Sequence, residues 1–256
     1  MERLPIWAES YLVRFSAIDK SDTMTLNALF NAFQELAVSH AENLGVGREA
    51  MAGTGQVWIL SRMSVQVDRR PKYNETVTMR SWPRNWEKLF ALRDFDVRDA
   101  QDVPIVRARS CWIIIDIEKR RPIRPQAALE GMHLNDGLDA LPFTPAGLAE
   151  RASMQKVASQ HASYTDVDYN GHVNNVSYIR WIENAVEPSL LERAKRSRLD
   201  INYMNEVLPG ETTDIRFEKI DPAAETPAPS HAFAFEGRKA QGNQTAFRSE
   251  LRLFSA

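Results

Sequence analysis

Two stretches of the sequence are copies of one another: SRMSVQVDRRPKYNETVTMR at residues 61–80 and SRLDINYMNEVLPGETTDIR at residues 197–216. They align without a gap at an offset of 136 residues, from Ser-Arg at the start to Glu-Thr near the end. In both copies apolar and polar residues alternate, which is typical of a half-buried β-strand. A repeat at so long a period indicates a duplicated domain rather than a solenoid of short units.

The duplication extends beyond these two stretches. FDVRDAQ, from Phe95, parallels FEGRKAQ, from Phe235, at an offset of 140 residues, and Asp19 parallels Asp168 at an offset of 149. The offsets of 149 and 136 differ by 13 residues, so the first half carries an insertion of about that length within ENLGVGREAMAGTGQVW. Both halves therefore share one order of elements.

Each half is predicted to form one helix followed by several strands. Apolar residues recur at helical spacing in TLNALFNAFQELAVSHA, from Thr25, and again from Val176 to Val186. The predicted strands are at residues 63–67, 77–79, 95–97 and 106–117, and at 199–203, 215–217, 233–235 and 251–253. This is an α+β pattern, with each antiparallel sheet wrapped around a helix. DPAAETPAPS, from Asp221, is predicted to connect two strands.

Composition limits the class of protein. The chain has 256 residues, of which 43% are hydrophobic, enough for one large or two modest cores and too many for a mainly disordered chain. No apolar run approaches the roughly 20 residues of a membrane span, and the start does not resemble a secretory signal. A single cysteine, Cys111, excludes an intrachain disulfide and a cysteine-based zinc cluster, so we expect a reducing cytoplasmic setting. A net charge of −2 does not favour nucleic-acid binding.

The segment YTDVDYNGHVNNVSYIRWIENAV, from Tyr164, carries the candidate chemistry and allows three interpretations. DVDYNG, from Asp166, opens like a calcium-binding loop, but Ser177 stands where that loop needs a bidentate glutamate. The polar residues could instead only cap the helix that follows. In the third interpretation, His172 with Asn170 and Asp168 forms a catalytic group at a helix N-terminus, where developing negative charge is favoured.

The internal repeat favours the catalytic interpretation. Asp168 has a counterpart in the first half, Asp19, so it could serve a shared turn. In contrast, Asn170 and His172 are replaced in the first copy by Ser21 and Thr23. Likewise, Glu206 falls opposite Arg70. A structural turn need not differ between two copies, whereas a single active site would.

These motifs resemble a known family. DVDYNGHVNNVSYIRWIEN resembles the D-x-N-x-H-V-N-N-x-x-Y-I-x-W signature of the acyl-acyl carrier protein thioesterases of plant plastids and bacteria. VWILSRMSVQVDRRP, from Val57, and RARSCWIIIDIEKRRPIRP, from Arg107, are similar to two other stretches of that family, and the resemblance extends over most of residues 8–218. It implies two tandem hotdog domains, each a sheet wrapped around a long helix. It also implies hydrolysis of the thioester between a fatty acyl chain and acyl carrier protein, which ends chain extension in fatty acid biosynthesis, with no metal or cofactor.

The resemblance implies site residues position by position. Asp168, Asn170 and His172 match the family's Asp-Asn-His set, and Glu206 matches its acidic residue on the following strand. Plant members often have a cysteine directly after that glutamate, where this chain has Val207. The chemistry must therefore use water or a carboxylate as the nucleophile.

Two versions of the mechanism remain open. In both, the Asn170 amide or backbone N–H groups polarise the carbonyl, and Asp168 orients Asn170 and His172. His172 and Glu206 then deprotonate a water, or Glu206 attacks directly and forms a mixed anhydride. Two rival functions are an acyl-coenzyme A thioesterase of the hotdog type and a catalytically silent hotdog that only binds acyl groups.

The resemblance also implies a division of labour. We expect an N-terminal hotdog that holds the acyl chain at residues 1–125, a linker at 126–160 and a catalytic C-terminal hotdog at 161–256. Candidate acyl-pocket residues are Phe30, Phe33, Trp58 and Met63, although the residue pattern alone assigns them to the core. Candidate contacts with the acidic carrier are Lys195, Arg196 and Arg198; two further basic clusters start at Arg69 and Lys119. The sequence leaves open a homodimer, the acyl chain length and saturation, and the choice between carrier protein and coenzyme A.

Overall fold

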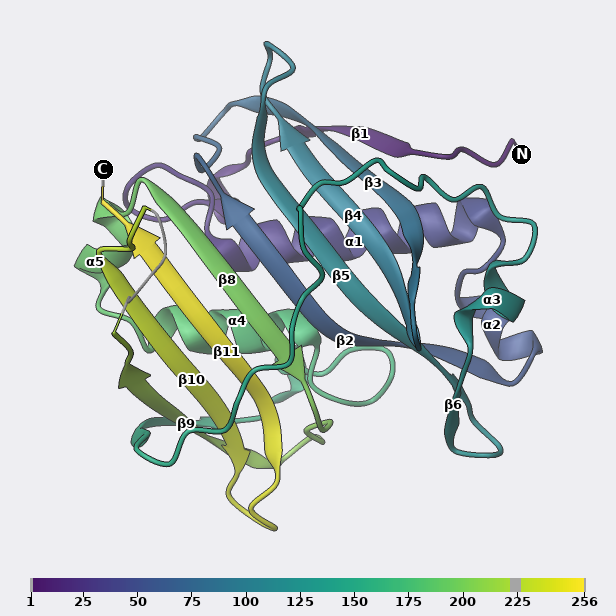
Figure 1. The fold of residues 1–256 in the computed structure, drawn as a ribbon. Helices are drawn as coiled ribbons and strands as arrows, with labels where there is room; N and C mark the ends of the chain where they lie inside the picture. Colours follow the sequence, from purple (N-terminus) through teal and green to yellow (C-terminus); the bar gives the residue numbers. More distant parts are fainter. Residues whose placement is uncertain (1, 222–226, 256) are drawn as a thin grey trace.

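The described residues form a single antiparallel sheet of 11 strands with its two longest helices on one side (Figure 1). A computed structural model describes residues 2–221 and 227–255. In the first half the elements are β1 (Trp7–Leu12), η1 (Phe15–Ala17), α1 (Leu26–Leu44), α2 (Arg48–Gly53), β2 (Gln56–Val67), β3 (Thr76–Glu87), β4 (Phe90–Arg98), β5 (Pro104–Asp116), β6 (Arg121–Ile123) and α3 (Pro125–Leu129). In the second half they are β7 (Gln155–His161), η2 (Tyr164–Asp166), α4 (Asn175–Asn184), α5 (Pro188–Arg193), β8 (Arg196–Tyr203), β9 (Thr212–Lys219), β10 (His231–Lys239) and β11 (Thr245–Phe254).

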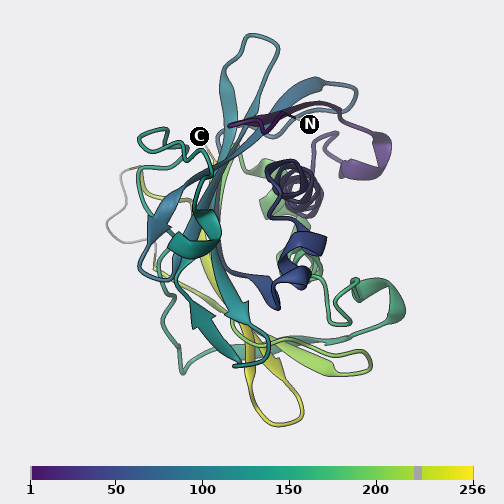
Figure 2. The same cartoon turned by 90° about the vertical axis from the view of Figure 1, so that its right-hand side faces the viewer.

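The sheet is built from two halves with the same strand order. Its order is β1-β3-β4-β5-β2 and then β8-β11-β10-β9-β7, so that β2 and β8 join the halves. Figure 2 shows the sheet curving around α1 and α4, which lie together on its concave side. The predicted α+β class, with two tandem hotdogs, is confirmed. The central β2–β8 pairing was not foreseen.

The ends of α1 follow from local sequence. Thr25 caps its start by accepting a hydrogen bond from the Ala28 N–H at 3.1 Å. Gly45 ends it in the left-handed region, with φ of 74°, which glycine adopts without a steric penalty. The insertion in the first half forms α2 and the approach to β2.

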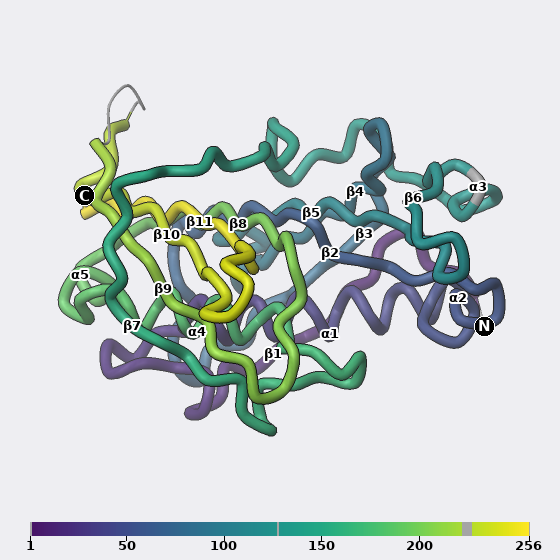
Figure 3. Tube along the Cα trace, turned by 90° about the horizontal axis from the view of Figure 1, so that it is seen from below, coloured from purple at the N-terminus to yellow at the C-terminus, as the bar shows by residue number. Residues whose placement is uncertain are grey.

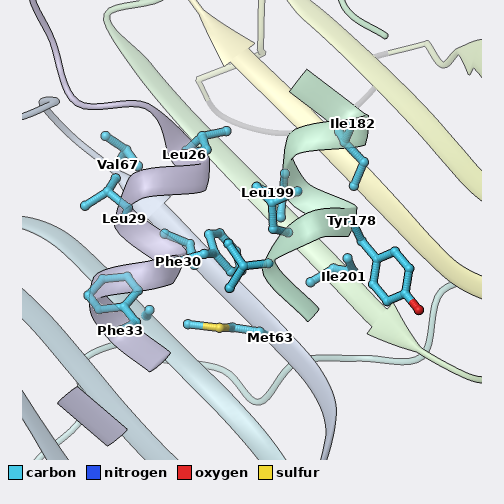
Figure 4. Close-up of a cluster of buried hydrophobic side chains, with 14 of the residues drawn as sticks. Leu26, Leu29, Phe30, Phe33, Met63, Val67, Tyr178, Ile182, Leu199 and Ile201 are labelled. Atoms are coloured by element: carbon cyan, nitrogen blue, oxygen red, sulfur yellow. The ribbon is translucent and has the colours of Figure 1, made fainter. Parts of the chain in front are cut away.

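One hydrophobic core extends across both halves. Figure 4 shows Phe30, Phe33 and Met63 of the first half in the same cluster as Ile182 and Ile201 of the second. Such a continuous core makes the two halves fold as a single body.

The connection between the halves crosses the convex face of the sheet, opposite the helices (Figure 3). Asn202 anchors it there by donating to Ala146 O at 3.0 Å and accepting from the Leu148 N–H at 2.7 Å. All of the strand β7 except His161 falls in residues 126–160, which were predicted to be a linker. This strand pairs with β9 and so belongs to the second half of the sheet. Of the predicted connection from Asp221, residues 222–226 lie outside the described residues. None of the helices in the described ranges has the length and apolar character that a membrane crossing requires.

Candidate functional site

The site is organised by the tight turn that precedes α4. The Asp168 N–H donates to His172 O at 2.9 Å, and the Asp168 carboxylate accepts from the Asn170 N–H at 2.8 Å. Gly171 has φ of 80°, which explains the glycine at this position. Asn174 caps α4 by accepting from the Val176 N–H at 2.9 Å. Capping is therefore performed by Asn174, which leaves Asn170 and His172 without a capping role.

The calcium interpretation is disfavoured by Asp166. This residue is buried, and its carboxylate is hydrogen-bonded to the Arg180 guanidinium and to the Ser163 N–H. A first calcium ligand would have to give up both partners. The loop is thus held by protein donors instead of being arranged around a cation.

His172 is oriented by two acceptors beside one ring nitrogen. Its Nδ1 lies 3.3 Å from Val173 O and 3.9 Å from the Asp168 carboxylate, and about a quarter of its side chain is exposed (28%). Because both neighbours of Nδ1 are acceptors, the neutral ring carries its proton on Nδ1. The lone pair of Nε2 is then available to take a proton from a reactant.

A backbone hydrogen bond brings Glu206 to the same place. The Val173 N–H donates to Val207 O at 2.8 Å, so the residues directly before these two, His172 and Glu206, lie on adjoining segments. Glu206 is exposed, and its backbone carbonyl accepts from Lys239 Nζ at 3.3 Å. The turn before α4 and the segment after β8 are thereby joined, and the Glu206 carboxylate makes no ion pair with a described residue.

Two tyrosines, absent from the predicted site, form its floor. Burial raises the pKa of Tyr178, and the nearby carboxylates of Asp168, Glu211 and Glu206 raise this pKa further, while the Val207 N–H lowers it. Burial likewise raises the pKa of Tyr203, whose ring is 6.0 Å from that of Tyr178 and whose buried hydroxyl has no hydrogen-bond partner among the described residues. The tyrosine of the Y-I-x-W motif was the sequence signal for Tyr178.

The first half has the same turn with different chemistry. The Asp19 N–H donates to Thr23 O at 3.0 Å, and the Met24 N–H donates to Pro71 O at 2.8 Å, which repeats both backbone contacts of the second half. Arg70 stands in the place of Glu206, and its guanidinium pairs with the Asp19 carboxylate at 2.5 Å. This copy therefore has an ion pair where the second has a free carboxylate and a histidine.

The predicted acyl-pocket residues lie in two environments. Phe30, Phe33 and Met63 are almost completely buried in the shared core. Trp58 is half-buried near the start of β2, and its Nε1 donates to Val46 O at 3.0 Å. The structure thus confirms the core assignment that the residue pattern gave for three of the four, and it does not test acyl binding.

Cys111 is removed from this chemistry. It is fully buried on β5, and burial raises the pKa of its thiol to about 12. The neighbouring Ser110 and Trp112 contact each other through a hydrogen bond of 2.7 Å from Trp112 Nε1, so they share one face of the strand and Cys111 occupies the other. A buried, protonated thiol is inert.

The three basic clusters differ in their surroundings. In the first, Arg69 and Arg70 are paired with Glu75 and Asp19. In the predicted carrier contact, Lys195 is exposed, Arg196 lies over the Phe254 ring, and Arg198 pairs with Asp200 at 2.9 Å. This cluster lies at the start of β8, whereas Glu206 follows the end of that strand, roughly 20–25 Å away at about 3.3 Å per residue. In the third, Arg120 and Arg121 are exposed and make no ion pair with a described residue.

Comparisons with known proteins agree with this arrangement. The models of the acyl-ACP thioesterase N-terminal and C-terminal domains match residues 5–128 and 149–249. A chloroplastic palmitoyl-acyl carrier protein thioesterase of Gossypium hirsutum is 26% identical over 218 residues, which cover 78% of this chain and 52% of that protein. The chain thus spans about half the length of these plant relatives.

Two solved structures share the whole fold. An acyl-ACP thioesterase from Bacteroides thetaiotaomicron superimposes with a TM-score of 0.83 at 25% identity, over 97% of both chains. A 12:0-ACP thioesterase from Umbellularia californica superimposes with a TM-score of 0.82 at 18% identity, over 98% of both chains. The second likeness concerns the fold alone.

Proposed function

The chain belongs to the acyl-ACP thioesterase family, and on that premise we propose that it hydrolyses the thioester between a fatty acyl chain and acyl carrier protein. The observation that carries the proposal is the 2.8 Å hydrogen bond between Val173 N–H and Val207 O, which joins the segments of His172 and Glu206. In the first half the equivalent bond joins segments that carry Thr23 and Arg70, neither of which is a base near neutral pH. The asymmetry supports one catalytic site, in the second half.

The proposed reaction begins with a water molecule between His172 and Glu206. Nε2 of His172 accepts a proton from the water while its oxygen attacks the carbonyl carbon. The tetrahedral intermediate collapses with cleavage of the C–S bond, and the protonated imidazole returns the proton to the sulfur. The products are a free fatty acid and the thiol of the carrier arm. Asp168 holds the ring in the tautomer that this requires.

Direct attack by Glu206 is the alternative first step. Its exposed carboxylate would form a mixed anhydride with release of the thiol, and water would then hydrolyse the anhydride. Hydrolysis in ¹⁸O-labelled water under single-turnover conditions tests for the anhydride. A label in Glu206, together with unlabelled oxygen in the first fatty acid released, establishes direct attack, because attack by water on the thioester labels the fatty acid and never Glu206.

The acyl chain is proposed to enter the first half beside Trp58 and to extend towards Met63. Arg48 of α2 lies over the Tyr169 ring at 3.1 Å, which brings this end of the first half against the catalytic turn. Trp58 donates a hydrogen bond to the backbone carbonyl of Val46, which is two residues before Arg48. These two contacts support an entrance beside the catalytic turn.

For the carrier protein we propose the exposed hairpin cluster of Lys119, Arg120 and Arg121 in place of the cluster at Lys195. The strand β5 ends at Asp116, which pairs with Gln56 at the start of β2, and Figure 1 shows β6 and α2 at the same end of the molecule. Arg120→Glu with Arg121→Glu is expected to raise KM for acyl-ACP about tenfold and to leave acyl-CoA turnover unchanged. Lys195→Glu with Arg196→Glu is the matched control, and a larger effect from the control would contradict this placement.

The test of the activity is thiol release from matched acyl-ACP and acyl-CoA substrates across chain lengths. We expect faster turnover, by kcat/KM, of the carrier-bound acyl group. A preference for acyl-CoA would identify the first rival function, and acyl binding without thiol release would identify the second. The cytoplasmic setting, the homodimer and the role in fatty acid biosynthesis remain predictions.

A further inference from the structure

An approximate two-fold axis relates the two halves, and two contacts mark it. Ser64 of β2 and Asp200 of β8 are equivalent by the offset of 136, and the Ser64 hydroxyl donates to the Asp200 carboxylate. Asn27 of α1 and Val176 of α4 are equivalent by the offset of 149, and Asn27 Nδ2 donates to Val176 O at 3.0 Å. Equivalent residues that touch each other must lie on the axis. The contacts of one half can therefore be transferred to the other.

In the first half, a residue from the second half accepts hydrogen bonds from the N–H groups at the N-terminus of α1. The Glu183 carboxylate accepts from the Leu26 N–H at 2.8 Å and from the Asn27 N–H at 3.0 Å. Glu183 also lines a cavity of about 30 Å³ together with Asp19 and Arg70. The first copy of the site thus combines the turn and helix start of one half with a side chain from the helix of the other.

Rotation about the axis places Gln34 of α1 where the N-terminus of α4 begins. Gln34 is equivalent to Glu183, and Asn175 and Val176 are equivalent to Leu26 and Asn27, all by the offset of 149. Gln34 is half-buried, and within the described ranges neither its side chain nor the Asn175 N–H makes a hydrogen bond. By the same symmetry, Gln34 borders the site of Asp168 and Glu206.

A second unsatisfied group lies at this place. The equivalent of Val67, which lines the small cavity of the first half, is Tyr203. Its buried hydroxyl lacks a partner in the described part of the chain. Buried polar groups without partners are rare, and each one needs an explanation such as a catalytic role or a bound water. A carbonyl oxygen of a bound thioester would supply an acceptor.

We infer that the side-chain amide of Gln34, supplied by the first half, donates a hydrogen bond to the thioester carbonyl in the site of the second half. The inference rests on the proposed thioesterase function. A carboxylate such as Glu183 can only accept, so it occupies the N–H groups at the start of α1 and repels a developing oxyanion. An amide can donate through Nε2 and leaves the Asn175 N–H free to donate to the same oxygen. Glu183 thus blocks the helix N–H groups in the first copy of the site, whereas Gln34 leaves them available to a substrate in the second copy.

The first test compares variants of Gln34. Gln34→Ala is expected to lower kcat about 100-fold, the usual effect of removing one oxyanion donor, with KM within about threefold of the wild type. Gln34→Glu, which keeps the size of the side chain, is expected to lose at least as much at pH 7. Its kcat relative to the wild type should rise as the pH falls, because a protonated carboxyl can donate and the titration of His172 is common to both proteins.

Two controls separate this role from a structural one. Asn31→Ala changes an exposed residue of the same helix, and Glu183→Gln changes the equivalent residue of the other copy. Both should keep kcat within about twofold. The inference is overturned if Gln34→Ala retains more than a third of the wild-type kcat, or if Gln34→Glu matches the wild type at pH 7 with no dependence of the ratio on pH.

A second measurement keeps this inference separate from the proposed function. An acyl-pantetheine ketone analogue, with CH₂ in place of sulfur and ¹³C at the carbonyl, should show a downfield carbonyl shift on binding that Gln34→Ala abolishes. That result without any wild-type thiol release would refute the hydrolase and retain Gln34 as the donor. Thiol release with an equal shift in both proteins would retain the hydrolase and refute the role of Gln34. If the analogue does not bind and no thiol is released, both the hydrolase function and the role of Gln34 are refuted.

Discussion

At the scale of single residues, the proposed chemistry depends most directly on His172. His172→Ala is expected to fold normally, because the side chain is partly exposed and makes only long contacts, with Val173 O and with the Asp168 carboxylate. It should lose most hydrolysis, roughly 100- to 10,000-fold, since a positioned base is removed. Steady-state kinetics on acyl-ACP with a thermal melt measures both. Retention of more than about a tenth of kcat/KM, a loss under about 1.4 kcal/mol, would exclude His172 as the base. His133→Ala, which removes an exposed histidine outside the site, is the control.

Another histidine, His40, makes stability depend on pH. It is fully buried, its Nδ1 lies 3.1 Å from the Arg93 guanidinium, and its Nε2 lies 2.8 Å from Leu4 O. Burial and the charge of Arg93 lower the pKa of His40 from 6.5 to about 4. The unfolded chain therefore binds a proton between these two pH values while the folded protein does not. The contribution of His40 to the free energy of unfolding is therefore greatest above pH 6.5, and it is lost as the pH falls from 6.5 towards 4.

The expected size of the His40 effect is about 3 kcal/mol, from a pKa difference of roughly two and a half units. Urea unfolding at pH 7 and pH 4 measures it. His40→Gln should be less stable than the wild type at pH 7 and should lose less stability on acidification, whereas the exposed His133→Gln should behave like the wild type. An equal loss in wild type and His40→Gln would show that carboxylates alone cause the acid dependence.

At the scale of elements, sequence patterns predicted where helices and strands form better than they predicted which strands pair with each other. Alternation around Val65 and Leu199 identified β2 and β8, because each has one face on the core. Their pairing with each other was not predicted, since it depends on residues 134 positions apart in the pair Val65–Leu199 and leaves no local signal. The same reason kept Gln34 out of the predicted site: its partner segment lies in the other half. The offset of 149 was the signal that could have identified it.

The strand β2 also carries the element-scale test of acyl binding. Met63→Ala removes a buried side chain that packs with Phe33 and Ile201 (Figure 4), and it should lower the free energy of unfolding by about 2–5 kcal/mol. If the acyl chain extends to Met63, the freed volume should move the preference towards longer chains. Met79→Ala is the matched control, since it removes an equally buried methionine from β3. A change in the chain-length profile for both variants, or for neither, would contradict the proposed route.

At the scale of the whole molecule, duplication gives two copies of one architecture, and only the second has the groups that the proposed hydrolysis uses. The first copy combines the Arg70–Asp19 ion pair with the Glu183 carboxylate on the N-terminus of α1. Burial raises the pKa of Glu183, and its two backbone donors and Arg70 lower that pKa in opposition. These contacts link the two halves, because Arg70 also donates to Leu191 O at 3.3 Å. The contacts of Arg70 and Glu183 thus hold the two halves together at this place.

This division predicts opposite outcomes for two equivalent positions. Glu206→Ala should abolish turnover and leave no residual activity from a second site, because Arg70 cannot accept a proton near neutral pH. Arg70→Ala should lower the melting temperature, since it leaves Asp19 without its ion pair in a partly buried place, and should spare kcat. Any kinetic loss should be confined to KM for the carrier-protein substrate. Kinetics and melting of both variants decide the point. If Arg70→Ala lowers kcat as severely as Glu206→Ala while both melt like the wild type, the first half also takes part in catalysis, and the proposal of a single site in the second half is wrong.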